Sequence, residues 1–197
     1  MDSFHIISWV VLSFFIGSVP FGFLFVLLKG KGDIRNFGSG NIGATNVARA
    51  GGSRLGIATL VCDLGKGALA VYLVQLWGLP DLIFAAAFSS VLGHIFTPWL
   101  KFEGGKGVAT LCGSLAVASP KLLFLVLLIF IGCFLSTRIV SLASIAATLS
   151  LPLFSLIFWN LTDTNFWLIT LLSTIVVLKH RTNITRLLNN EEPTFHF

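Results

Sequence analysis

The chain has 197 residues, of which 55% are hydrophobic and 11% are charged, and its mean hydropathy is +0.93. A soluble domain carries about 25% charged residues. This composition therefore excludes a soluble protein and predicts an integral membrane protein. The formal net charge of +5 does not predict nucleic-acid binding, because no polar segment combines aromatic with basic side chains. In a membrane protein an excess of Lys and Arg is better explained by topology. Three widely spaced cysteines inside apolar runs predict neither a disulfide framework nor a zinc site.

Apolar runs of helical length recur along the whole chain. The first follows residues that lack the basic segment of a cleavable signal sequence, so we expect it to be retained as a transmembrane helix. The runs cover residues 4–28, 54–78, 82–99, 107–118, 120–135, 139–158 and 164–178. A full span needs about 20 residues. The fourth run has 12, and we expect a short or tilted span there, or one that borrows residues from its flanks.

The positions of the basic residues support seven spans. With that count, eleven of the thirteen Lys and Arg lie on one side of the membrane, Lys121 lies on the other, and Lys66 lies within a span. The positive-inside rule places the basic side in the cytoplasm. We therefore expect an all-α bundle of seven transmembrane helices that forms one domain over residues 1–197, with the N-terminus outside and the C-terminus cytoplasmic. The tail, residues 189–197, is expected to be mobile.

The first of three polar clusters on that side is rich in glycine. Its Gly38-x-Gly40-x-x-Gly43 pattern matches a dinucleotide-binding fingerprint, but that motif needs a preceding strand, and the neighbours here are apolar helical runs. Glycines before a helix also let backbone N–H groups converge on an anion. In a helix, Thr45 and Arg49 would lie one turn apart, with Asn46 close by. The alternative is a loop that anchors to lipid head groups, for which Asn and Thr are not needed.

The second and third clusters carry a lysine and a histidine. Lys106 lies among Gly104, Gly105 and Gly107, where backbone can approach a ligand closely; the alternative is an ordinary interfacial lysine. The segment lacks the first glycine and the Ser/Thr of a phosphate-binding P-loop. His180 and Asn183 are one helical turn apart at the end of the last run. The neighbouring Lys and Arg residues are typical of the cytoplasmic end of a transmembrane helix and need no further role.

Asp63 and Lys66 stand three residues apart inside an apolar run. Charges in a span are costly and often functional, but this pair can neutralise itself, and we favour a structural role. His94 and Ser141 are lesser candidates. Scattered acidic residues offer no magnesium or two-metal cradle, and no Gly-x-Ser-x-Gly elbow occurs. We expect neither a cofactor nor a metal.

At these clusters the chain resembles the bacterial acylphosphate:glycerol-3-phosphate acyltransferases, the PlsY family, and the likeness covers nearly the whole chain. Residues 39–49 are similar to the family's first motif, residues 93–110 to its second and residues 179–187 to its third. The third motif usually continues with a glycine before a glutamate. Here Asn189-Asn190-Glu191 stands instead, which weakens a role for Glu191.

The resemblance implies a compact seven-helix enzyme of the bacterial cytoplasmic (inner) membrane whose active site faces the cytoplasm. It implies that acyl phosphate and glycerol 3-phosphate give lysophosphatidic acid and inorganic phosphate, the first step of phospholipid biosynthesis, with the donor supplied by an acyl-phosphate-forming enzyme. The implied catalytic residues are Ser39, Asn46, Arg49, Lys106, His180 and Asn183. The implied substrate-binding residues are Gly38, Gly40, Asn41, Thr45, Gly104, Gly105, Gly107 and Ser141.

Three other functions are less well supported by the sequence. A transporter or channel for a phosphorylated anion would explain the basic clusters and the short fourth run, but it should often show inverted repeats and a site at the membrane midplane, and the clusters here are interfacial. A structural protein would not need Asn and Thr beside the glycine loop. A phosphatidyltransferase is disfavoured because its aspartate set is missing.

Overall fold

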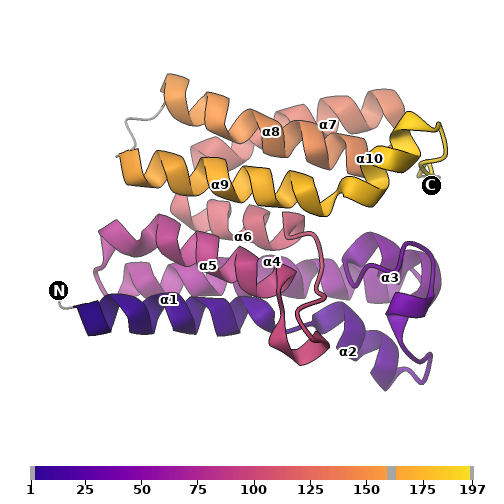
Figure 1. The fold of residues 1–197 in the computed structure, drawn as a ribbon, viewed down its shortest axis with the longest axis horizontal. Coiled ribbons are helices and arrows are strands. Elements are labelled where there is room, and N and C mark those ends of the chain that lie inside the picture. Colours follow the sequence, from indigo (N-terminus) through magenta and orange to yellow (C-terminus); the bar gives the residue numbers. More distant parts are fainter. Residues whose placement is uncertain (1–2, 159–162, 196–197) are drawn as a thin grey trace. The chain divides into compact units, whose positions relative to one another are not determined.

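The computed structural model describes residues 3–158 and 163–195, and the regular structure in these ranges is entirely helical, as expected (Figure 1). The α-helices are α1 (Ser3–Ser18), α2 (Phe21–Leu28), α3 (Ala44–Gly51), α4 (Ser53–Leu76), α5 (Ile83–Ile95), α6 (Val108–Ala118), α7 (Pro120–Thr137), α8 (Val140–Phe158), α9 (Asp163–Lys179) and α10 (Arg181–Leu188). The 3-10 turns are η1 (Ile34–Asn36), η2 (Pro80–Leu82) and η3 (Pro98–Leu100).

Every predicted apolar run contains a helix. Within the described ranges, four segments are long and apolar enough to cross a membrane, and they are Ser3–Leu28, Ser53–Leu76, Pro80–Leu100 and Pro120–Thr137. Three apolar helices are shorter, Val108–Ala118, Val140–Leu156 and Thr164–Lys179. The chain is a membrane protein, and the count of seven spans and the orientation of the termini stay predictions.

The chain divides into two compact units, Met1–Ala118 and Ser119–Phe197. In the N-terminal unit α1 packs against α5, and α4 packs against both α5 and α6. Gly93 of α5 lies so close to α1 that an added Cβ would overlap the backbone of Phe14, and Gly113 of α6 approaches Leu64 of α4 in the same way. Such close approach through small residues is typical of helices packed in lipid. In the C-terminal unit α8 packs against α7 and α9, and a single domain stays a prediction.

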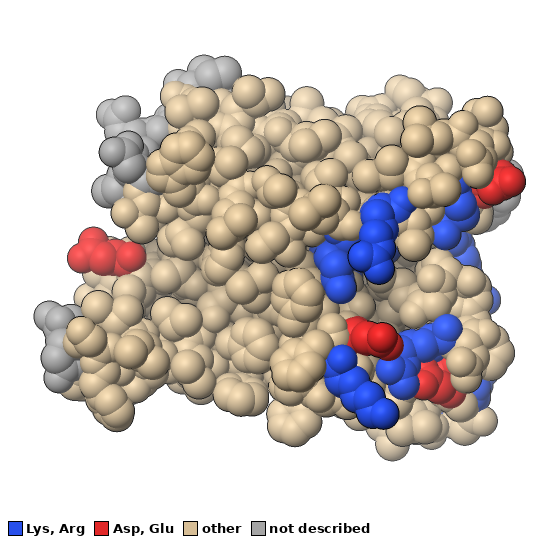
Figure 2. Space-filling view, in the orientation of Figure 1, with Lys and Arg blue, Asp and Glu red and all other residues tan. Residues whose placement is uncertain are grey.

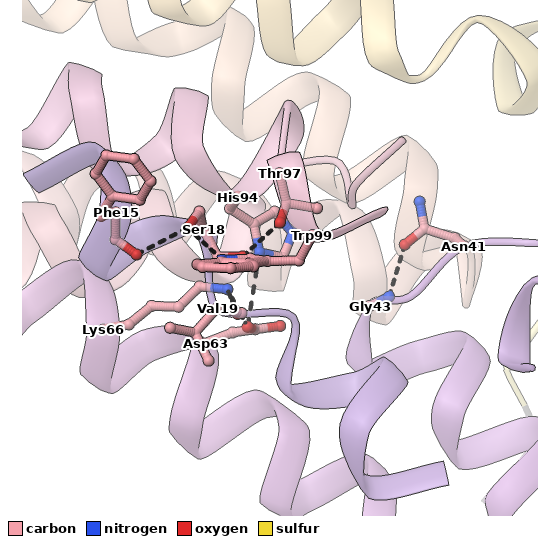
Figure 3. A network of polar contacts seen from close by, with 10 residues as sticks. All are labelled: Phe15, Ser18, Val19, Asn41, Gly43, Asp63, Lys66, His94, Thr97 and Trp99. Carbon is pink, nitrogen blue, oxygen red and sulfur yellow. Dashed lines mark hydrogen bonds and ion pairs between the residues drawn. The ribbon is translucent and has the colours of Figure 1, made fainter. Parts of the chain in front are cut away.

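We expected the first apolar run to form one helix, but it forms two. The helix α1 ends at Ser18 and α2 begins at Phe21. Pro20 causes the break, since proline has no N–H and disfavours a helical residue before it. The break exposes carbonyls that apolar surroundings cannot satisfy. Thr97 Oγ1 donates to the carbonyl of Ser18 at 2.6 Å, and Lys66 Nζ donates to that of Val19 at 2.8 Å. The break is therefore tied to α4 and to the segment after α5 (Figure 3).

Candidate functional site

The first glycine loop, residues 37–43, is held by the side chain of Asn46. Its Oδ1 accepts the N–H of Ser39 at 2.9 Å, and its Nδ2 donates to the carbonyls of Phe37 and Asn41 at 3.0 and 2.8 Å. Asn46 is 2% exposed. Because three hydrogen bonds to the loop engage this amide, Asn46 fixes the loop's backbone and leaves Ser39 exposed at its tip.

Two glycines make the turn of this loop possible. Gly38 and Gly40 have φ values of 55° and 70°, the left-handed region that other residues avoid. A Cβ on Gly38 would also overlap Asn46 Oδ1. The Oδ1 of Asn41 accepts the N–H of Gly43 at 2.7 Å, directly before α3 begins. The helix expected after the loop is confirmed.

The helix α3 carries two further predicted site residues. Thr45 and Arg49 lie one turn apart on it, as the spacing predicted, with Thr45 half-buried and Arg49 exposed. The Cβ of a residue at Gly56 would overlap Ala48, so α3 rests closely on α4. Arg49 thus projects from a helix whose position is fixed by packing.

The second glycine loop, residues 101–107, folds back over the end of α5. Lys101 and Phe102 both adopt positive φ, 56° and 65°, which reverses the chain. The N–H of Gly104 then donates to the carbonyl of Ile95 at 3.0 Å. Lys106 follows, half-buried, and Gly107 leads into the N-terminus of α6. Backbone N–H groups at a helix N-terminus favour an anion, and Lys106 adds a positive charge beside them.

Both glycine loops lie at the same end of the N-terminal unit. Arg35, which precedes the first loop, forms a 2.7 Å ion pair with Asp33 and lies 3.7 Å from Glu103 in the second loop. The hydrogen bond from Arg35 holds the pKa of the Asp33 carboxyl below its usual range. Ile42 and Leu100 share one buried apolar cluster beneath the loops. In this unit the Lys and Arg side chains on the face shown gather around α2 and α3 (Figure 2).

The C-terminal unit carries Ser141, His180 and Asn183. Ser141 lies in the first turn of α8, His180 directly precedes α10, and Asn183 lies in its first turn. They are 7%, 2% and 3% exposed. The Nδ1 of His180 lies 2.7 Å from the carbonyl oxygen of Val176, which can only accept, so Nδ1 carries a proton. In the neutral ring Nε2 is then the unprotonated nitrogen.

Glu192, which the sequence did not single out, connects these elements. Its Oε1 accepts from Ser141 Oγ at 2.7 Å and from Asn183 Nδ2 at 2.6 Å, and its Oε2 accepts from Arg186 Nε at 2.7 Å. Its side chain is 5% exposed. Burial raises the pKa of the Glu192 carboxyl, but these hydrogen bonds outweigh that effect and hold the pKa below its usual value.

The expectation of a mobile tail is wrong for residues 189–195. Besides Glu192, the N–H of Phe195 donates to the carbonyl of Arg138 at 2.8 Å, and the Phe195 ring packs on that of Phe134. Asn190 has a φ of 58°, a left-handed conformation that Asn tolerates better than most residues. Glu192 rather than the neighbouring Glu191 takes the buried position. Residues 196 and 197 lie outside the described range.

We predict that replacing Glu192 makes stability less dependent on acidity. A carboxyl whose folded pKa is lowered stabilises the fold above its unfolded pKa, near 4.5, and this stabilisation is lost as pH falls through the folded pKa. The melting temperature of Glu192→Gln in detergent should therefore lie below that of the parent at pH 7. The gap should narrow below pH 4.5.

Glu191 is the exposed neighbour of Glu192, so Glu191→Gln is the matched control. Its melting temperature should equal that of the parent at pH 7 and below pH 4.5. A gap for Glu192→Gln that stays constant from pH 7 to below the folded pKa would contradict the charged, hydrogen-bonded state of this carboxyl.

Comparisons with known proteins show which family this chain belongs to. The family model for glycerol-3-phosphate acyltransferase matches residues 7–190. A glycerol-3-phosphate acyltransferase of Brucella anthropi is 41% identical over 191 residues, covering 96% of this chain and 93% of the relative. Crystal structures of PlsY, an integral membrane glycerol 3-phosphate acyltransferase, match in the glycerol 3-phosphate form (36% identity, TM-score 0.91) and the lysophosphatidic acid form (34%, 0.87). Each match covers 98% of this chain and 96% of the other. This chain belongs to the glycerol-3-phosphate acyltransferase family.

Proposed function

We propose that this membrane acyltransferase moves a fatty acyl group from acyl phosphate to the 1-hydroxyl of glycerol 3-phosphate. The observation that carries the proposal is the pair of glycine loops at one end of the N-terminal unit, each beside a basic residue of the matching motif, Arg49 or Lys106. Acyl phosphate and glycerol 3-phosphate each carry a phosphate, and N–H groups together with cations are what phosphates need. Neither the family nor its relatives support the transporter alternative.

The reaction needs no cofactor, because acyl phosphate is already an activated mixed anhydride. The 1-hydroxyl oxygen bonds to the acyl carbon, the bond from that carbon to the phosphate oxygen breaks, and inorganic phosphate leaves. The hydroxyl proton passes to the phosphate of glycerol 3-phosphate, whose second pKa is about 6. The transfer is therefore direct and substrate-assisted, with no covalent enzyme intermediate.

The N-terminal unit supplies most of the phosphate-binding groups. The first loop offers the exposed Ser39 hydroxyl, while Asn46 acts through its bonds to that loop. Thr45 and Arg49 offer a hydroxyl and a guanidinium one turn apart. Lys106, which lies just before α6, stabilises negative charge on the departing phosphate. Fixed donors of this kind cost no reorganisation during the reaction.

In the C-terminal unit, the residues to which the family resemblance assigns site roles are His180, Asn183 and Ser141. Glu192 fixes the side chains of Ser141 and Asn183 by hydrogen bonds, so it orients them. The basic side of the predicted seven-span topology supports a location in the bacterial cytoplasmic membrane, with the site facing the cytoplasm. Its acyl phosphate would come from an acyl-phosphate-forming enzyme.

We predict that the purified protein forms lysophosphatidic acid from palmitoyl phosphate and labelled glycerol 3-phosphate, and forms none from palmitoyl-CoA. Lys106→Gln should lower kcat/KM by about 100-fold or more, as expected when a charge-stabilising donor is removed. The exposed lysine of the same loop provides the control, and Lys101→Gln should stay within about threefold. Folded parent protein that is inactive with both donors would refute the proposal.

We also predict that the pH dependence of kcat/KM survives the loss of His180. If the substrate's phosphate accepts the proton, His180→Gln should be slower but keep a rise in kcat/KM at about pH 6, measured from pH 5 to 9. Thr182→Ala, a change at an exposed neighbour on α10, should match the parent. Disappearance of the rise in His180→Gln alone would identify His180 as the general base instead.

A further inference from the structure

Three titratable side chains that the proposed mechanism does not use lie together in the N-terminal unit (Figure 3). Asp63 and Lys66 belong to α4, and His94 belongs to the last turn of α5. Lys66 Nζ lies 2.7 Å from Asp63 Oδ1, and His94 Nδ1 lies 3.6 Å from the same oxygen. None of the three residues is more than 5% exposed.

The break between α1 and α2 accounts for two of them. Charges in an apolar span must be paired, and Asp63 pairs with Lys66. Lys66 also donates to the carbonyl of Val19, and its Nζ lies 5.7 Å from the centre of the Phe21 ring. This pair therefore holds the broken helix to α4. The anchoring of the break does not require His94.

His94 lies between this ion pair and the second glycine loop. Its backbone carbonyl accepts the N–H of Gly105 at 3.1 Å. A Cβ on Gly105 would overlap the Nε2 of the His94 ring, and one on Gly104 would overlap the His94 carbonyl oxygen. The loop thus rests directly on this histidine, and the residue that follows Gly105 is Lys106.

We propose that His94 is a positioning residue: its ring, oriented by Asp63, supports Gly104 and Gly105 and so fixes where Lys106 presents its charge. The Asp63 carboxylate faces the Nδ1 side of the imidazole at 3.6 Å, and the opposite edge of the ring meets Gly105, where only glycine fits. The buried ion pair at the helix break is thereby linked to the loop. The catalytic consequence of this support rests on the function proposed above, whereas the support itself does not.

Two variants of His94 test this role in the full-length protein in detergent. His94→Leu removes the polar ring and leaves the Asp63–Lys66 pair intact, while His94→Gln keeps a polar group near the position of Nε2. Ser89→Ala is the control, because Ser89 is on the same helix and its Oγ donates a buried hydrogen bond to the carbonyl of Val10 at 2.7 Å. Each protein is measured for hydrogen exchange at the amides of Gly104 and Gly105 and for the KM of glycerol 3-phosphate.

We expect His94→Leu to speed exchange at these two amides and to raise the KM, each by about tenfold or more, as for residues that share one network. His94→Gln should show smaller changes, and Ser89→Ala should show neither. Exchange or KM within about threefold of the parent in a folded His94→Leu protein would overturn the proposal. If His94→Leu does not fold, the same null result in His94→Gln would overturn it. Inactivity of the parent would instead refute the proposed function, and the exchange data would still test the support.

Discussion

The structure of the N-terminal unit depends on satisfying two backbone carbonyls where Pro20 breaks the first apolar helix. In apolar surroundings an unsatisfied carbonyl is costly, and here Thr97 and Lys66 donate to the carbonyls of Ser18 and Val19. Lys66 is tolerated because Asp63 neutralises it. Trp99 also donates to the Ser18 hydroxyl at 2.9 Å. One break in a helix therefore fixes α1, α4 and the segment after α5 to one another.

The glycine loops are built on this fixed base. The segment that begins at Thr97 reverses direction at Lys101 and Phe102, which both have positive φ. The N–H groups of Gly104 and Gly105 then donate to backbone carbonyls at the end of α5. Asn46, which belongs to α3, holds the backbone of the first loop by hydrogen bonds to Ser39 and Phe37. Each loop is thus held by a buried polar residue. Rigid support of this kind is what electrostatic stabilisation of a reaction requires.

Much of this could be predicted from sequence, because periodic hydrophobicity and glycine placement are local signals. The apolar runs, the helix after the first loop and the Asp63–Lys66 pair all followed from spacing. Pro20 itself could have predicted the break in the first run. We expected one helix there because the run is continuously hydrophobic. The contact of His94 with Asp63 and the burial of Glu192 had no such local signal. They depend on tertiary packing between segments far apart in the chain.

The central claim, that both glycine loops bind phosphate, is tested most directly by hydrogen exchange in the parent protein with and without glycerol 3-phosphate and inorganic phosphate. We predict slower exchange in residues 37–49 and 101–110 when these ligands are present, because a bound anion engages N–H groups at the adjoining helix N-termini and restricts opening of the loops. The exposed segment 29–32 should not change. Unchanged exchange in both loops, under conditions where lysophosphatidic acid forms, would contradict the account.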